Sequence, residues 1–198
     1  MSDHPLQPSL HTGPPQPGWL HSDELFPEVD VSQRFLTAMS ALAATVTVIT
    51  AASPSGERNG MTATAVCSLS NDPPMLVACI NRSSGLARAL TQTRWFTVNL
   101  LASNQEHVAA TFAGRDGRSG EERFDPDLWS AHPSGAPVLR GAASSCVCHV
   151  ANGLQQATHM VLIGVVHDVI LPESDPPLPL MYHMRRFTTP HQMPGDRP

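Results

Sequence analysis

Between residues 45 and 80 the sequence contains three strand-like runs that only short turns can join. TVTVIT (45–50) alternates hydroxyl and β-branched apolar side chains, which predicts a half-buried strand. After the turn SPSGERNG, a second run covers 61–70 and ends at Asp-Pro-Pro (72–74), where a turn is expected. MLVACI (75–80) is unbroken and apolar, as in a central strand covered on both faces. Parallel strands need long crossover connections, so these strands should be antiparallel.

The rest of the chain adds more strands than helices. Phe35, Met39 and Leu42 have the spacing of one buried helical face, and shorter helices are expected within 84–93 and 104–114. Further strands are predicted in WFTVNLL, SSCVCHVA, THMVLIGVVHDVI and LPLMYHM. The expected fold is therefore mainly β with a few helices, an antiparallel sheet closed as a barrel.

The 198 residues suit one domain with two tails. Residues 1–28 are rich in proline and lack periodicity, which predicts a disordered arm, and 189–198 have the same character. The domain should cover 29–188. Within it, 115–137 is polar and glycine-rich, a long surface excursion of the kind that is often functional.

Composition excludes several classes of protein. The net charge of −5, with dispersed arginines and no lysine, argues against nucleic-acid binding, which needs a basic patch. No apolar run approaches the roughly 20 residues of a membrane-spanning helix, and no secretory signal is present. We expect a cytoplasmic protein. Four cysteines and ten histidines show no metal-ligand spacing, so buried free thiols and no metal site are expected.

The run 61–70 carries little bulk. Read as one strand, it places Thr62, Thr64 and Ser68 on one face and small residues such as Ala63 and Ala65 on the other. One interpretation is an edge strand with a solvated hydroxyl face. The other is a ligand site, in which small side chains let a flat ring approach the backbone and exposed N–H groups bind polar ring atoms or a phosphate.

Two further places could contact a ligand. In NRSSG (81–85), Ser83, Ser84 and the N–H groups of the next helix could hold a phosphate, although a simple helix cap explains the same residues. His159 opens an apolar strand, where a structural histidine and a cofactor contact are both possible interpretations. Neither a P-loop nor a G-x-G-x-x-G pattern occurs.

In their order, these motifs resemble the short-chain flavin reductases, the reductase components of two-component flavin monooxygenases. The resemblance rests on FLTAMSALAATVTVIT, GMTATAVCSLSNDPP running into MLVACI, FTVNLLASNQEHVAATFAG, RF at 123–124, GAPVLRGA, TH before MVLIGVV, and PLMYHMRRF. It implies a split β-barrel that binds FMN or FAD, uses NADH or NADPH as co-substrate, and forms a homodimer. It also implies a partner flavin-dependent monooxygenase that receives free reduced flavin.

The resemblance also assigns site residues. Its flavin contacts correspond to Val46, Thr47, Met61, Thr62, Ala63, Thr64, Ala65, Cys67, Ser68, Asn81, Ser83 and Ser84. Its pyridine-nucleotide contacts correspond to His159, Tyr182, His183, Arg185 and Arg186, with His159 near the nicotinamide. No side-chain acid or base is expected in the hydride step, because the cofactors carry the chemistry and the protein orients them.

The chain departs from the family pattern at four places. Thr45 replaces a common Gly, and Thr64-Ala65 replace Asn-Ser. Ala157-Thr158 replace Gly-Asp, and Met184-Arg185 replace Arg-Gly, both within the pyridine-nucleotide region. Two alternatives to a flavin reductase therefore stay open: a flavin-binding protein without efficient NAD(P)H oxidation, and a haem-binding split barrel with His159 as the candidate ligand.

Overall fold

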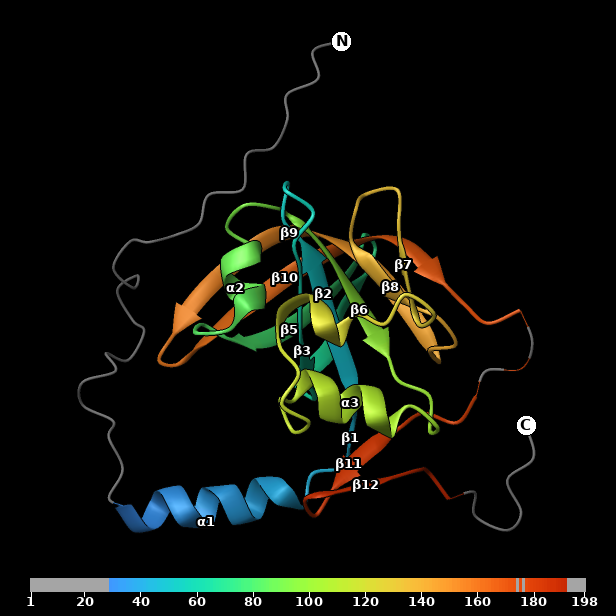
Figure 1. The fold of residues 1–198 in the computed structure, drawn as a ribbon. Coiled ribbons are helices and arrows are strands. Elements are labelled where there is room, and N and C mark those ends of the chain that lie inside the picture. Colours follow the sequence, from blue (N-terminus) through green and yellow to red (C-terminus); the bar gives the residue numbers. More distant parts are fainter. Residues whose placement is uncertain (1–28, 174, 176, 192–198) are drawn as a thin grey trace.

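The computed structural model describes residues 29–173, 175 and 177–191, and the N-terminal arm predicted for 1–28 lies outside them. Seven strands form one antiparallel sheet in the order β3-β2-β6-β9-β10-β5-β4 (Figure 1). Their bounds are Arg58–Ala63 for β3, Thr47–Ala52 for β2, Trp95–Leu100 for β6, Ser144–Gln156 for β9, His159–Ile170 for β10, Pro74–Asn81 for β5 and Val66–Asn71 for β4. The antiparallel, mainly β architecture predicted from the sequence is confirmed.

The barrel is split rather than closed. Its two edge strands, β3 and β4, follow each other in the chain and are joined only by Thr64 and Ala65, with no ladder between them. The sequence predicted one continuous strand over 61–70, which is wrong because the strand is broken at Thr64 and Ala65. The expected closure of the barrel is also wrong, because the two edge strands do not pair with each other. The chain leaves one edge of the sheet and enters the other, which requires a bend between the two strands.

Smaller elements surround the sheet. The helices are α1 (Val29–Ser40), α2 (Gly85–Ala89), α3 (Glu106–Phe112) and the 3₁₀ turn η2 (Gly120–Arg123). The remaining strands are β1 (Ala44–Thr45), which pairs with the hairpin of β11 (Met181–His183) and β12 (Arg186–Thr188), and the hairpin of β7 (Trp129–Ala131) and β8 (Pro137–Leu139). No helix in the described ranges is both long and apolar enough to cross a membrane.

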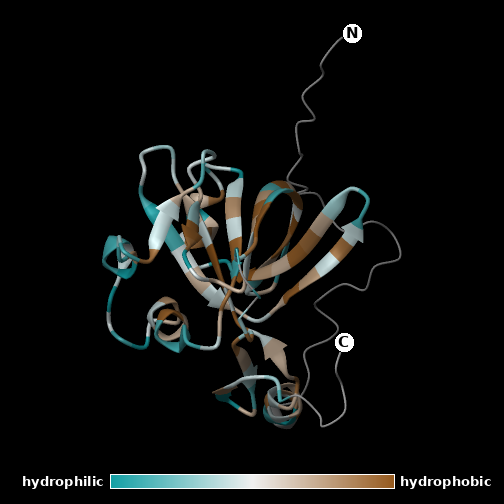
Figure 2. Cartoon of the chain, turned by 90° about the vertical axis from the view of Figure 1, so that its right-hand side faces the viewer, coloured by the Kyte–Doolittle hydropathy of each residue, from teal (hydrophilic) through white to brown (hydrophobic). Residues whose placement is uncertain are grey.

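The core lies on both faces of β2. Ile49 and Ala51 pack into the barrel interior with Phe96 and Leu162, while Val48 packs on the opposite face against α3 and the excursion. All residues from 46 to 51 are buried, so the strand predicted to be half-buried is fully covered. Figure 2 shows this distribution, with apolar residues concentrated along the strands and α3 and polar residues in the connecting loops.

The excursion after α3 is anchored by aromatic packing, as the sequence predicted. Phe124 and Trp129 are buried and surround Phe112 of α3, with ring centroids 5.0 to 5.2 Å apart. Asn99 of β6 fastens the same region to the barrel. Its Oδ1 accepts hydrogen bonds from the Leu139 N–H and the Ser145 hydroxyl, both at 2.9 Å.

α1 departs from the expectation of a buried apolar face. Phe35, Met39 and Leu42 are 45 to 60% exposed, and the helix lies at one end of the molecule beside the β11–β12 hairpin (Figure 1). Its C-terminal end is held there, because the Met184 N–H donates to the Ser40 carbonyl at 2.7 Å. The helical period was correctly identified, but nothing in the described part of the chain covers that face.

Candidate active site

The bend between β3 and β4 creates free backbone donors. Thr64 and Ala65 are exposed, and their N–H groups donate to no other group of the described chain. The Ala65 carbonyl, in contrast, accepts from the Cys79 N–H at 2.9 Å and ties the bend to β5. The small residues at the middle of the predicted strand thus form a gap in the sheet with two available donors.

A pocket of about 190 Å³ opens beside this bend. One wall consists of the small or β-branched residues Val46, Thr62, Ala63 and Thr64, and the other of Ala113, Arg115, Tyr182 and Phe187. Tyr182 and Phe187 contact each other edge to face, with centroids 5.3 Å apart. A slot between a wall of low bulk and a wall of aromatic rings suits a flat ligand.

The predicted flavin residues divide into three groups. Val46, Thr62, Ala63 and Thr64 line the pocket, and Thr47 is buried beside it, with its hydroxyl donating to the Ala63 carbonyl at 2.7 Å. Met61 packs against the barrel core instead. Ala65, Cys67 and Ser68 are exposed at the bend and along β4, so the prediction of buried thiols is wrong for Cys67. Its thiol is free, and it lies on an edge strand.

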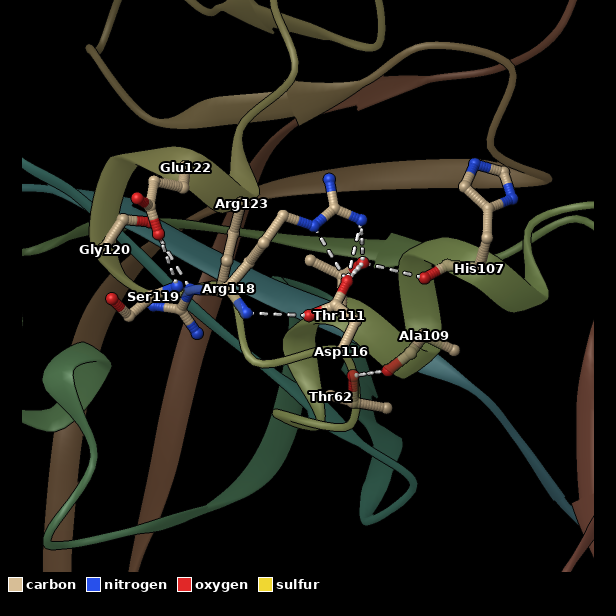
Figure 3. Close-up of polar contacts among 10 residues, drawn as sticks. All are labelled: Thr62, His107, Ala109, Thr111, Asp116, Arg118, Ser119, Gly120, Glu122 and Arg123. Atoms are coloured by element: carbon tan, nitrogen blue, oxygen red, sulfur yellow. Dashed lines mark hydrogen bonds and ion pairs between the residues drawn. The ribbon is translucent and has the colours of Figure 1, made fainter.

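Thr62 shows why residue type alone was ambiguous. Its hydroxyl donates to the Ala109 carbonyl of α3 at 2.7 Å, as Figure 3 shows, so this group fastens the helix to β3. Only the Thr62 atoms that face the pocket remain for a ligand. The hydroxyl face inferred for the whole run therefore serves partly for structure.

The predicted phosphate segment forms an ordered turn at the end of β5. Asn81 Oδ1 accepts from both the N–H and the hydroxyl of Ser83, at 2.9 and 2.8 Å. Ser84 caps α2, because its Oγ accepts from the Ala87 N–H at 3.1 Å. The helix-cap interpretation of Ser84 is confirmed, and the turn lies two residues beyond the Cys79 contact with the bend.

The predicted pyridine-nucleotide residues fall in two places. His159 is exposed and pairs with Asn81 in the β10–β5 ladder, while its Nδ1 lies 2.9 Å from the Thr158 hydroxyl. Tyr182 belongs to the pocket. His183, Arg185 and Arg186 are exposed on the β11–β12 hairpin and do not line it. His159 therefore lies beside the predicted phosphate turn, whereas Tyr182 lies at the pocket.

The two places in the predicted pyridine-nucleotide region where the sequence departs from the family pattern both form turns with positive φ angles. Ala157 has φ of +47°, and Met184 and Arg185 have φ of +48° and +62°. These are left-handed conformations that glycine adopts without a Cβ clash and that other residues adopt at a cost. The hairpins keep their tight geometry although the sequence lacks the glycine expected in each.

Sequence reasoning missed Arg115. It follows Gly114, whose φ of +73° ends α3, and its Nη2 donates to the Tyr182 hydroxyl at 3.4 Å. The sequence shows an arginine directly after the glycine that ends the helix. The neighbouring residues do not indicate that its side chain reaches Tyr182, 67 positions further along the chain.

A second, larger cavity of about 400 Å³ lies between α3 and the excursion. Two of its lining residues, Thr111 and Arg118, belong to a polar network with Asp116 (Figure 3): Arg118 contacts the Asp116 carboxylate at 2.7 Å, and Thr111 Oγ1 lies 2.6 Å from the same carboxylate. The hydrogen bond from Thr111, together with Arg118, lowers the pKa of Asp116 to about 2. Because these groups satisfy each other, the network stabilises the excursion. No cluster of three metal-ligating side chains occurs among the residues that could be searched.

The fold and the pocket define a split-barrel protein with a pocket beside the gap between its edge strands. Residues 39–191 match the family model described as the flavin reductase like domain. The chain therefore belongs to the flavin reductase-like family, as the resemblance indicated.

Individual relatives agree with this assignment. The chain is 38% identical over 175 residues to FMN reductase (NADH) RutF of Pseudomonas syringae pv. syringae, covering 88% of this chain and 94% of that protein. It is 37% identical over 154 residues to the 4-hydroxyphenylacetate 3-monooxygenase reductase component of Salmonella typhi, covering 78% and 89%. The styrene monooxygenase flavin reductase from Pseudomonas putida S12 superposes with a TM-score of 0.71 at 28% identity, covering 80% and 99%. The expected class of activity, flavin reduction for a partner monooxygenase, is confirmed.

Proposed function

We propose that this protein oxidises NADH, reduces FMN, and releases the reduced flavin to a separate monooxygenase. The observation that carries the proposal is the pocket beside the Thr64–Ala65 bend, which combines residues of low bulk, two aromatic rings and the two N–H groups of the bend that make no hydrogen bond within the described chain. Relatives named as NADH-dependent FMN reductases and as monooxygenase reductase components support the choice of substrates and partner.

The flavin ring would lie against Val46, Thr62, Ala63 and Thr64. Low bulk on this wall allows close approach to the backbone, and the free donors of the bend suit the electron-rich oxygen and nitrogen atoms at the ring edge. The other proposed flavin contacts are Thr47, Met61, Ala65, Cys67, Ser68, Asn81, Ser83 and Ser84. Of these, the turn at 81–84 would bind the phosphate, next to the guanidinium of Arg82.

Hydride transfer needs little from the side chains. If flavin and reduced nicotinamide were both bound, the cofactors would supply the chemistry, a hydride passing from nicotinamide C4 to flavin N5. The side chains of the pocket would contribute by orienting the two rings. His159 would orient the nicotinamide from the Asn81 end, with Tyr182, His183, Arg185 and Arg186 contributing from the C-terminal hairpin.

The functional protein would be a cytoplasmic homodimer built from the domain at 29–188. A physical reason for a dimer is the exposed apolar surface of α1 and of the residue pair after it, where Val31, Phe35, Leu36 and Met39 of the helix and Leu42 just beyond its end are 45 to 60% exposed. A twelve-residue helix is marginal in water unless an apolar face packs against something. A second copy of the chain would cover this face.

One assay tests the function. Purified protein is mixed with NADH or NADPH and with FMN, FAD or riboflavin, and loss of the reduced-nicotinamide absorbance is followed. We expect the highest kcat/KM with NADH and FMN. Faster turnover with FAD or NADPH would change the assigned cofactor. If no pair gives flavin-dependent oxidation, the assignment as a flavin reductase is wrong. A yellow but inactive protein would support the flavin-binding alternative, and a haem absorption band the haem-binding one.

A further inference from the structure

Arg115 connects the end of α3 to the C-terminal hairpin. Its N–H donates to the Ala110 carbonyl at 3.0 Å, which fixes the backbone just after the Gly114 turn. Its side chain then crosses to the hairpin, where Nη2 donates to the Tyr182 hydroxyl and Cζ lies 5.4 Å from the centroid of the Phe187 ring. The guanidinium is thus held over one wall of the pocket by a hydrogen bond and a cation–π contact.

No carboxylate of the described residues forms an ion pair with this cation. Arg115 is the one charged side chain among the eight residues that line the pocket. The ion pairs among the described residues join Arg58 to Glu121, Arg118 to Asp116 and His132 to Asp168, and none of them includes Arg115. A positive charge therefore faces a slot whose other walls are hydroxyl, aliphatic or aromatic.

The position of the charge indicates which part of a ligand it meets. Arg115 shares the pocket with Thr62, Ala63 and Thr64, the proposed wall for the ring, whereas the proposed phosphate turn at 81–84 contributes nothing to the pocket lining. A neutral oxidised ring gains little from a nearby cation. The same ring gains more after it has received a hydride, because the transfer adds one negative charge, and a fixed cation stabilises that charge.

We propose that Arg115 makes the pocket sensitive to the redox state of the flavin, because its charge raises the affinity for the reduced ring relative to the affinity for the oxidised ring. This inference rests on the proposed function. It assigns to Arg115 an electrostatic role in the forward reaction, since stabilising the reduced product lowers the free energy of the state that follows hydride transfer. Tyr182 supports this role by fixing the guanidinium over the pocket, which limits how far the charge can move into solvent.

The test compares the affinities of oxidised FMN and of anaerobically reduced FMN for the full-length protein. Arg115→Gln should lower the ratio of reduced to oxidised affinity about tenfold, equivalent to a reduction potential of the bound flavin about 30 mV lower for a two-electron couple. Arg115→Lys should keep most of the ratio, because the positive charge remains. Arg140→Gln is the matched control, since Arg140 is exposed and lies outside the pocket.

Other outcomes overturn the proposal. If Arg115→Gln weakens both affinities equally, or leaves both unchanged, Arg115 has no redox selectivity. If Arg115→Gln does not fold, the proposal is tested by measuring the ratio of reduced to oxidised FMN affinity of the wild-type protein at increasing salt concentration. An exposed charge is screened, so the ratio should fall with ionic strength, and a constant ratio contradicts the proposal. Wild-type protein that binds no flavin at all would instead overturn the proposed function, and the inference with it.

Discussion

Asn81 and His159 occupy facing positions in the β5–β10 ladder. Asn81 organises the turn proposed for the flavin phosphate, and His159 is the residue proposed to orient the nicotinamide. They are 78 positions apart in sequence, and strand pairing alone makes them neighbours. The proposed flavin-phosphate turn and the residue proposed to orient the nicotinamide are therefore neighbours across this ladder.

His159→Ala should weaken the use of NADH more than the binding of flavin. One hydrogen bond contributes about 0.5–1.5 kcal/mol to the free energy of binding, so its loss predicts a rise in KM for NADH of roughly two- to tenfold. The dissociation constant for FMN should change little. Steady-state kinetics and fluorescence titration measure the two quantities, and Thr158→Val, which removes the hydroxyl 2.9 Å from Nδ1, should give a smaller effect of the same kind. Equal losses in both quantities would contradict the assigned role.

Glycine at the two strained turns should stabilise the protein. Ala157→Gly and Arg185→Gly each relieve a left-handed conformation that costs about 1–2 kcal/mol, against a loss of backbone entropy of about 0.5–1 kcal/mol. We expect a net gain of up to about 1 kcal/mol for each in chemical denaturation. Ala131→Gly, in β7 at ordinary φ, is the control and should destabilise. A loss of stability in all three variants would show that the turns are not strained.

Asn99→Ala should destabilise the fold strongly. Asn99 is fully buried, and its removal leaves the Leu139 N–H and the Ser145 hydroxyl without their acceptor. Each such buried group costs about 1–3 kcal/mol, so the free energy of unfolding should fall by roughly 2–6 kcal/mol. Thr97→Val provides the contrast, because the buried Thr97 hydroxyl has no hydrogen-bond partner, and its removal should be neutral or stabilising. A similar fall in the free energy of unfolding for both substitutions would contradict the stabilising role of the Asn99 hydrogen bonds.

The ion pair of Asp116 should contribute stability that depends on pH. Since the pKa of Asp116 is lowered from 3.8 to about 2 in the folded state, its ionised form favours folding above pH 3.8. This contribution is lost as the pH falls from 3.8 to about 2. Asp116→Asn should therefore be less stable than wild type near neutral pH, and the difference should shrink over that interval. Denaturation curves of Asp127→Asn, another exposed carboxylate on the excursion, should follow wild type throughout.

Charge placed on α1 should separate the proposed dimer. Phe35 and Leu42 are 59% and 60% exposed, so Phe35→Glu with Leu42→Glu should leave the fold of the subunit intact. Light scattering after size exclusion should show half the wild-type mass, whereas Ser32→Glu on the same helix should remain dimeric. A wild-type protein that is already monomeric, or a double variant that stays dimeric, would contradict the role of this face.

Much of the fold could be predicted because it depends on local chemistry. A strand within 45–50, a hairpin turn within SPSGERNG and the helix stop at Gly114 all appear where the sequence placed them, although the strand begins at Thr47 and is buried on both faces. Phe124 and Trp129 were correctly identified as anchors, because large aromatic side chains in a polar segment must be buried to offset its ordering. The ordered motifs also sufficed to assign the family.

Other features depend on residues that are far apart in the chain. Whether Thr62 offers its hydroxyl to a ligand was decided by the Ala109 carbonyl of α3, and whether Phe35 is buried was decided by where α1 projects. The bend at Thr64–Ala65 arises because two consecutive strands pair with different neighbours, β2 and β5, which no local pattern encodes. Side-chain period determines which residues share a face, but only the completed sheet determines what each face meets. For this reason Arg115, which reaches Tyr182 across 67 positions, became visible as a site residue only in three dimensions.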